Sequence, residues 1–237
     1  MAREERIIVA LDVSSIEEVE ALVDKLRPSV KIFKIGSELF TACGIRAVEV
    51  IRRKGCKVFL DLKYHDIPNT VMKAARSAAK QGIDIITVHA LGGLEMMKKA
   101  SQAAREEAAR LQASPPLILG VTVLTSMDKK DLRSVGISGS PDEEVIRLVG
   151  LAEKAGLDGV VASAREIESI RKNVKGDFLI VTPGIRPSWA GRSDQKRTAT
   201  PKEAIEMGAD YLVIGRPITA QEDPQAAAER IIEEIKN

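Results

Sequence analysis

Residues 57–63 read Lys57-Val58-Phe59-Leu60-Asp61-Leu62-Lys63. The run alternates as a β-strand does, in which successive side chains point to opposite faces. Phe59, Asp61 and Lys63 would share one face of this strand, and the other face would be wholly apolar. Two opposite charges on an otherwise apolar strand face are costly to bury unless they pair or take part in chemistry. The end of this strand is therefore the first candidate site.

Short apolar runs of this kind alternate with longer amphipathic runs along the whole chain. The expected strands are residues 7–12, 31–36, 57–63, 83–89, 117–123, 159–162, 178–182 and 211–215. The expected helices are residues 16–26, 38–53, 71–81, 94–111, 142–155, 164–173, 201–207 and 224–236. Strands and helices that alternate with short connections predict an α/β protein with a parallel sheet.

An open, doubly wound sheet is the alternative to a closed barrel. The chain carries neither GxGxxG after its first expected strand nor the P-loop motif GxxxxGK[ST]. The count of strand–helix units favours a (β/α)8 TIM barrel, and 237 residues suit one such domain over residues 1–237. The longest irregular stretch, residues 183–200, follows the seventh expected strand, and loops of this length are usually functional.

Composition argues against several classes of partner. The 36 basic and 34 acidic residues leave a net charge of +2, which favours neither a nucleic-acid nor a membrane partner. No run approaches the ~20 apolar residues of a membrane span, and the N-terminus shows no signal peptide. Cys43 and Cys56, with no CxxC motif, predict a reducing, cytoplasmic environment. His65 and His89 are the only histidines and have no third ligand at zinc spacing, so no metal site is expected.

Charged residues recur near the ends of the first three expected strands. Period-two alternation puts Asp12, Lys34 and the Asp61–Lys63 pair on corresponding faces of the three strands. In a parallel barrel these faces point inward, and active sites are built at the C-terminal rim. We expect these four charges of alternating sign to converge on one mouth, with Asp66 just beyond. A solvated ion-pair network at the rim is the alternative.

Glycine and arginine follow the seventh and eighth expected strands. The seventh continues as Pro183-Gly184-Ile185-Arg186, and the eighth ends in Gly215-Arg216. Loops at these two positions of a TIM barrel frequently bind phosphate. Glycine lets the backbone approach an anion, and arginine supplies a planar fork of donors. The pattern predicts a phosphate site, and surface salt bridges are the alternative for Arg186 and Arg216.

Several motifs occur together along the chain. They are Asp12, Phe33-Lys34-Ile35-Gly36, Asp61-Leu62-Lys63-Tyr64-His65-Asp66-Ile67-Pro68-Asn69-Thr70, Leu124-Thr125-Ser126, Val181-Thr182-Pro183-Gly184-Ile185-Arg186, Gln195 and Gly215-Arg216. With these motifs the chain resembles the orotidine 5′-phosphate decarboxylase family over essentially its whole length. The core Asp-x-Lys-x-x-Asp is shared with other phosphosugar barrels, whereas the continuation in residues 67–70 points to the decarboxylase.

The resemblance implies a catalytic centre without cofactor or metal. Lys63 would donate a proton to C6 of the pyrimidine of orotidine 5′-phosphate. Asp61 and Asp66 would flank Lys63, and Lys34 would complete a chain of alternating charges. The family is homodimeric, so Asp66 would come from the neighbouring subunit together with Ile67 and Thr70.

The resemblance also implies contacts along the rest of the substrate. Asp12 and Lys34 would hold the ribose. Thr125 and Ser126 would lie against the base; from the residues alone, capping of a helix near Asp128 explains these hydroxyls equally well. The phosphate and its link to the base would be held by Arg186, Gln195, Gly215 and Arg216.

Two other functions remain open at this stage. A metal-dependent 3-hexulose-6-phosphate synthase, or a related sugar-phosphate decarboxylase, would use the same barrel with magnesium bridging its carboxylates. A non-catalytic phosphate-binding barrel is the third possibility, but it gives no reason for Lys63 to lie between Asp61 and Asp66. Lysine between two acids fits the metal-free chemistry better.

Overall fold

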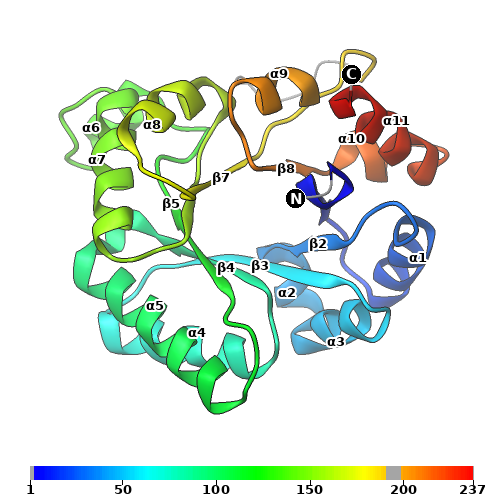
Figure 1. Ribbon diagram of the computed structural model, residues 1–237, viewed down its shortest axis with the longest axis horizontal. Coiled ribbons are helices and arrows are strands. Elements are labelled where there is room, and N and C mark those ends of the chain that lie inside the picture. The colour runs from blue at the N-terminus through cyan, green and yellow to red at the C-terminus, as the bar shows by residue number, and fades with distance from the viewer. Residues whose placement is uncertain (1–2, 191–198, 237) are drawn as a thin grey trace.

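Eight parallel strands close into a barrel in the computed structural model, which describes residues 3–190 and 199–236. Each strand pairs with the next along the chain, and β8 pairs with β1. The strands are β1 (Ile7–Leu11), β2 (Ile32–Ile35), β3 (Lys57–Tyr64), β4 (Ile85–His89), β5 (Leu117–Val121), β6 (Gly159–Val161), β7 (Leu179–Thr182) and β8 (Tyr211–Ile214). Figure 1 shows the strands in the middle of the molecule with helices around them. The prediction of a (β/α)8 barrel is confirmed.

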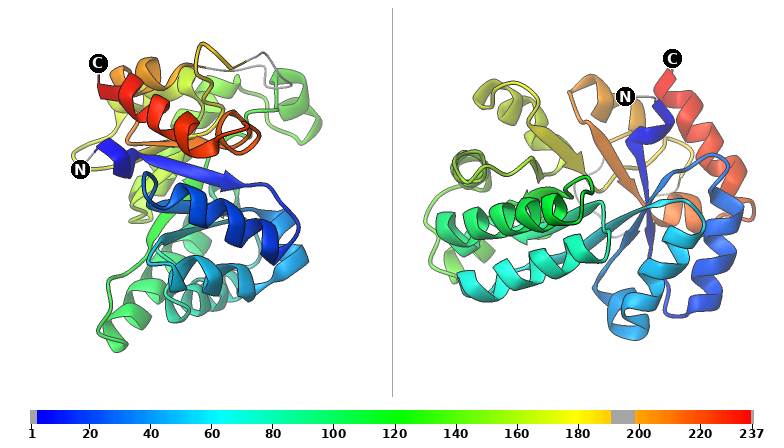
Figure 2. Two further views of the ribbon diagram at one scale, coloured as in Figure 1. Left: turned by 90° about the vertical axis from the view of Figure 1, so that its right-hand side faces the viewer. Right: turned by 60° about the horizontal axis from the view of Figure 1, so that its bottom comes forward.

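Helices connect the strands and cover the outside of the barrel (Figure 2). They are α1 (Ile16–Leu26), α2 (Ser37–Cys43), α3 (Ile45–Arg53), α4 (Pro68–Lys80), α5 (Gly93–Arg110), α6 (Lys129–Ser134), α7 (Pro141–Lys154), α8 (Ile167–Asn173), α9 (Pro201–Glu206), α10 (Arg216–Thr219) and α11 (Pro224–Lys236). Short 3₁₀ turns lie at η1 (Arg3–Arg6), η2 (Ala90–Gly92) and η3 (Ala164–Glu166). α4 and α5 lie side by side.

Alternation along the strands separates two apolar layers. In β1, Ile7, Val9 and Leu11 belong to the outer layer between the sheet and the helices. Ile8 and Ala10 belong to the inner layer, which fills the barrel. The other buried members of the inner layer are Ile32, Phe59, Ile85, Leu119, Val181, Tyr211 and Val213. The strand faces that carry the charged residues therefore point into the barrel, as the alternation of the sequence predicts.

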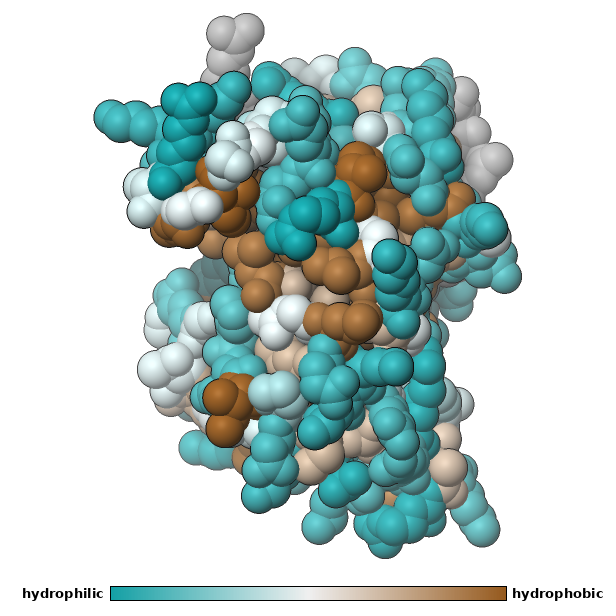
Figure 3. All heavy atoms as spheres, turned by 90° about the vertical axis from the view of Figure 1, so that its left-hand side faces the viewer, coloured by the Kyte–Doolittle hydropathy of each residue, from teal (hydrophilic) through white to brown (hydrophobic). Residues whose placement is uncertain are grey.

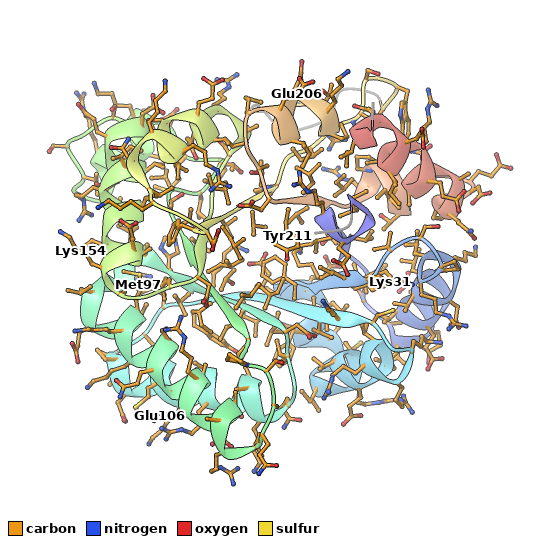
Figure 4. All side chains as sticks on the ribbon, in the orientation of Figure 1. Lys31, Met97, Glu106, Lys154, Glu206 and Tyr211 are labelled. Atoms are coloured by element: carbon orange, nitrogen blue, oxygen red, sulfur yellow. The ribbon has the colours of Figure 1, made fainter. Side chains whose placement is uncertain are left out.

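Buried and exposed side chains follow this division. Tyr211, of which 8% is exposed, lies near the middle of the barrel in Figure 4, whereas Glu106, Lys154 and Glu206 lie on its periphery. On the face in Figure 3, hydrophobic residues gather in the middle between hydrophilic margins. Over the described part of the chain, no helix is long and apolar enough to cross a membrane.

One expected helix is two helices. The sequence predicts a single helix over residues 38–53, but α2 ends at Cys43 and α3 begins at Ile45, with Gly44 between them. Gly44 has φ +58° and ψ −144°, a backbone conformation that only glycine adopts without steric cost. The amphipathic pattern runs through this position, so periodicity alone does not reveal the break.

The remaining differences concern helix starts and short helices. α4 begins at Pro68 rather than residue 71, because proline suits the first turn of a helix. α6 is not among the expected helices, but a helix near Asp128 is the alternative given for Thr125 and Ser126; Asp128 itself caps it, in a capping box with Asp131. α10, which begins directly after Gly215, is also unexpected. Each strand boundary lies within two residues of its prediction.

β3 is irregular at its C-terminal end. Its pairing with β4 shifts register between Leu60 and Tyr64. Within this bulge, Lys63 has φ +50°, in the left-handed region that side chains other than glycine rarely adopt. Bulges at barrel rims redirect side chains, and such strain persists only where neighbouring contacts maintain it. The backbone conformation of Lys63 therefore depends on contacts with neighbouring residues at the rim.

Candidate active site

A cavity of about 290 Å³ opens at the C-terminal ends of the strands. Its lining combines the charged residues expected at the mouth with an apolar wall and two arginines. The lining residues are Ala10, Asp12, Lys34, Phe59, Asp61, Lys63, Val121, Val123, Leu124, Thr125, Val161, Ala162, Pro183, Gly184, Ile185, Arg186, Val213, Gly215, Arg216 and Pro217. Ligand pockets commonly have such a composition, largely apolar with a few convergent polar groups.

Four charges form a continuous chain across the mouth. Lys63 Nζ donates to Asp61 Oδ2 at 2.9 Å. Lys34 Nζ lies 3.9 Å from the same oxygen and 3.7 Å from Asp12 Oδ1. The side chains of Lys34 and Asp61 are 12% and 13% exposed, whereas those of Lys63 and Asp12 are 37% and 55% exposed. The charges alternate in sign, so the largely buried Lys34 and Asp61 each lie beside charges of opposite sign, which offset the free-energy cost of burying them.

Thr87 is also part of this network, although it is not among the site residues predicted from the sequence. Its hydroxyl accepts from the backbone N–H of Lys63 at 2.9 Å and lies 3.0 Å from Asp61 Oδ1. Thr87 is fully buried in β4, on the inward face with Ile85. The sequence does contain a signal for this role: Thr87 places a hydroxyl at an inward position of a largely apolar strand that pairs with β3.

Arg186, Gly215 and Arg216 lie together at the cavity, beyond the charged chain. The backbone N–H of Arg186 donates to the carbonyl of Ala199 at 2.9 Å, which joins the two described ends of the loop. The buried Arg186 Nε has no hydrogen-bond partner among the described residues. At Gly215, a Cβ would lie 3.1 Å from Asp12 Oδ2, so glycine allows β8 to approach that carboxylate. The arrangement can hold an anion beside the charged mouth.

Several other predicted site residues lie outside the cavity. Thr125 lines it, but Ser126 is exposed and does not. Asp66, Ile67 and Thr70 are also exposed, and the Asp66 carboxylate accepts from the N–H of Ile67 at 2.6 Å. In the part of the chain that the structure describes, Asp66 forms no ion pair with Lys63. Gln195 lies outside the described residues.

The two histidines stack beside the charged mouth. The rings of His65 and His89 have centroids 5.3 Å apart and an interplanar angle of 27°. His89 Nδ1 accepts from the N–H of Leu91 at 3.4 Å, which requires a neutral ring. Burial, reinforced by the charges of His65 and Lys63, lowers the pKa of His89 to about 4. His89 therefore remains neutral in the folded protein down to mildly acidic pH.

The lowered pKa predicts a loss of stability on acidification. The unfolded chain binds a proton at His89 as the pH falls below about 6.5, whereas the folded protein does so only near pH 4. With allowance for partial exposure of His89, the free energy of unfolding should be about 1 kcal/mol lower at pH 5 than at pH 7, which lowers Tm by roughly 2–4 °C.

Thermal unfolding between pH 7 and pH 5 tests this expectation. Asparagine keeps an acceptor for the Leu91 N–H and does not titrate, so His89→Asn should lose less stability than the native chain. Equal losses in the two proteins would contradict a role for His89.

The described residues provide few ligands for a metal ion. Among them, no group of three or more His, Cys, Asp and Glu side chains is placed to hold one. Asp61, the most buried carboxylate of the mouth, already faces the ammonium groups of Lys34 and Lys63.

Fold and site together define the class of protein, a (β/α)8 barrel with the motif Asp-x-Lys-x-x-Asp at the C-terminal end of β3. The model of the orotidine 5′-phosphate decarboxylase / HUMPS family matches residues 5–231, and the chain belongs to this family.

Individual relatives are similar over nearly the full length. The chain is 53% identical over 237 residues to the orotidine 5′-phosphate decarboxylase of Moorella thermoacetica, covering 100% of this chain and 94% of that protein. Identity to the enzyme of the same name from Syntrophotalea carbinolica is 54% over 230 residues, covering 97% and 94%. A crystal structure of orotidine 5′-phosphate decarboxylase from Lactobacillus acidophilus has a TM-score of 0.88 at 41% identity, covering 98% of this chain and 100% of that chain.

Proposed function

We propose that this protein decarboxylates orotidine 5′-phosphate to uridine 5′-phosphate in de novo pyrimidine biosynthesis. The observation that carries the proposal is the position of Lys63 Nζ, 2.9 Å from Asp61 Oδ2 in a cavity that Arg186 and Arg216 also line. A cation that can donate a proton thus shares one cavity with cations that can hold a phosphate. Relatives more than 50% identical to the chain carry the name of this activity.

Lys63 performs the chemistry in this proposal. The bond from C6 to the carboxylate breaks, CO₂ leaves, and the electron pair stays in the ring plane, where no π system delocalises it. The Lys63 ammonium stabilises this charge as it develops and then donates a proton to C6. Two unit charges ~4 Å apart interact by ~4 kcal/mol at an effective dielectric constant of ~20. The placement of one ammonium therefore supplies what other decarboxylases obtain from a cofactor, and none is needed.

The acidic residues direct this ammonium, and Lys34 extends the chain of alternating charges. Asp61 contacts both lysines, since its Oδ2 lies 2.9 Å from Lys63 Nζ and 3.9 Å from Lys34 Nζ. Asp66 completes the chain of alternating charges from the neighbouring subunit. The carboxylates also repel the carboxylate of the substrate at C6, and this repulsion is relieved when neutral CO₂ leaves.

The rest of the substrate lies along the cavity. Asp12 and Lys34 hold the ribose hydroxyls, and Thr125 lies against the base with Ser126. Groups that bind the phosphate and its link to the base are Arg186, Gln195, Gly215 and Arg216. Binding energy from this remote phosphate is available to position the ring beside Lys63 and to exclude water from it.

The active form is a homodimer in which each chain completes its partner's site. Asp66, Ile67 and Thr70 are exposed and do not line the cavity of their own chain, with Ile67 66% exposed. Leu91 and Leu94, after the adjacent β4, are also exposed apolar residues. Where exposed apolar residues gather into one patch, they mark protein–protein contacts.

The enzyme acts as one barrel domain in the cytoplasm, without a nucleic-acid or membrane partner. The free thiols of Cys43 and Cys56 suit a reducing compartment. The synthase alternative is not favoured, because the similar relatives are named as decarboxylases and lysines surround Asp61.

A spectrophotometric assay tests the proposed function. The absorbance of orotidine 5′-phosphate should fall on addition of the protein, at the same rate with and without a chelator. A chelator-sensitive reaction, or turnover of a hexulose phosphate in place of the nucleotide, would overturn the proposal.

Replacing Arg216 tests the phosphate site. Loss of charge-assisted hydrogen bonds in Arg216→Ala should weaken binding of uridine 5′-phosphate by about 10–100-fold and leave binding of uridine nearly unchanged. Calorimetric titration of both ligands measures this difference. Arg53→Ala is the matched control, because Arg53 is exposed at the C-terminal end of α3 and does not line the cavity. Equal weakening of nucleotide and nucleoside would argue against a phosphate role.

A further inference from the structure

The hydroxyl of Thr87 joins the two residues on which the proposed chemistry depends. It accepts the Lys63 backbone N–H at 2.9 Å and contacts Asp61 Oδ1 at 3.0 Å. A hydroxyl has one proton to donate, and the Asp61 carboxylate, beside two ammonium groups, only accepts. The direction of the chain is therefore fixed: Lys63 N–H donates to Thr87, and Thr87 donates to Asp61.

The first of these bonds replaces a strand contact that the bulge removes. β3 and β4 pair regularly as far as Leu60 and resume only at Tyr64. Between them Lys63 has φ +50°, and its N–H bonds to a side chain of β4 instead of a β4 carbonyl. A left-handed non-glycine residue persists only where its surroundings maintain it. The Thr87 hydroxyl provides that contact, so it helps to set the direction in which the Lys63 side chain projects from β3.

The second bond fixes the rotation of the Asp61 carboxylate. Oδ1 is taken by Thr87, and Oδ2 is left for Lys63 Nζ at 2.9 Å and Lys34 Nζ at 3.9 Å. Without the hydroxyl the carboxylate is free to turn about its terminal bond, and the lysines lose a fixed anion between them. Thr87 itself is fully buried and does not line the cavity, so it acts through these two neighbours.

We propose that Thr87 is a positioning residue for the decarboxylation: its hydroxyl holds the left-handed backbone of Lys63 and the orientation of Asp61, and so directs the Lys63 ammonium at C6. The inference rests on the proposed function and adds to it a residue from the neighbouring strand. Misplacement of a catalytic group by about 1 Å costs on the order of 100-fold in rate. The effect should fall on kcat, because Thr87 does not itself line the cavity and contacts the two residues that act at C6 rather than those proposed to hold the phosphate.

Steady-state kinetics of Thr87→Val, which keeps the shape and removes the hydroxyl, test the proposal. We expect kcat to fall by about 10–100-fold, with KM for orotidine 5′-phosphate and affinity for uridine 5′-phosphate within about threefold of native values. Thr87→Ser should restore most of kcat. The matched control is Thr122→Val, because Thr122 is also fully buried but its hydroxyl donates to the Val161 carbonyl at 3.0 Å, away from the charged chain. That variant should keep the native kcat.

The possible outcomes separate this inference from the proposed function. A native protein without decarboxylase activity would overturn the function itself. An active native protein whose Thr87→Val variant keeps its kcat, or loses as much as Thr122→Val, would overturn the positioning role alone. Should Thr87→Val not fold, Thr87→Ser and Thr87→Cys offer the same comparison, because a thiol is a weak hydrogen-bonding group of similar shape. Equal kcat values for these two variants would also refute the role.

Discussion

Lys63→Ala is expected to abolish decarboxylation while binding of uridine 5′-phosphate remains detectable. The variant loses both the charge that stabilises the C6 carbanion and the proton that quenches it. General acid catalysis and electrostatic stabilisation are each worth at least ~100-fold, so kcat should fall by on the order of 10⁴-fold or more. The arginines proposed to hold the phosphate, Arg186 after β7 and Arg216 at the start of α10, are distant from Lys63 in the chain, so their binding role should be retained. Loss of orotidine 5′-phosphate absorbance and calorimetric titration with uridine 5′-phosphate measure the two quantities.

Lys57→Ala is the matched control for this experiment. Lys57 lies at the opposite end of β3, is exposed and does not line the cavity. Its removal should change neither quantity. Undiminished decarboxylation by Lys63→Ala would refute the assignment of the proton donor, and with it the proposed mechanism.

Mixing two inactive variants, Lys63→Ala and Asp66→Ala, is expected to restore activity. If Asp66 acts in the partner's site, each hybrid dimer contains one site with both residues native. Complete exchange at equal amounts makes half of the dimers hybrid, each with one good site, so recovery should approach about one quarter of native activity, as a two-fold symmetric dimer requires. Turnover per subunit after exchange, compared with each variant alone, measures this.

Mixing Lys63→Ala with Asp61→Ala is the control. Asp61 and Lys63 lie on the same strand of one chain and pair at 2.9 Å, so every site in that hybrid lacks one of them. No recovery is expected there. Failure of the first mixture to recover, with subunit exchange demonstrated by mass, would show that Asp66 does not act across the interface.

The barrel and the location of the charged mouth could be predicted from the sequence because both depend on short-range patterns. Alternation assigns the inward face of a strand directly, so it predicts Asp12, Lys34, Asp61 and Lys63 at one mouth. The two helices that replace residues 38–53 show the limit of this reasoning. A single positive-φ glycine ends α2, and it does not interrupt the amphipathic period.

Contacts between strands could not be predicted in the same way. The register shift between β3 and β4 changes which backbone groups have ladder partners, and no property of either strand alone specifies it. Thr87 becomes important only because this shift brings its hydroxyl to the Lys63 N–H. Asp66 provides the complementary case, since it lies close to Lys63 in sequence and yet outside the cavity.

The eight-unit barrel, the inward faces of its strands and the charges at the C-terminal mouth follow from the period of side chains along each segment, so they can be predicted from the amino-acid sequence. The strained backbone of Lys63, the division of the Asp61 oxygens between a hydroxyl and two ammonium groups, and the place of Asp66, Ile67 and Thr70 outside the cavity emerge only in the folded chain. Such features depend on contacts between groups that are distant in the chain and meet at separations of about 3 Å.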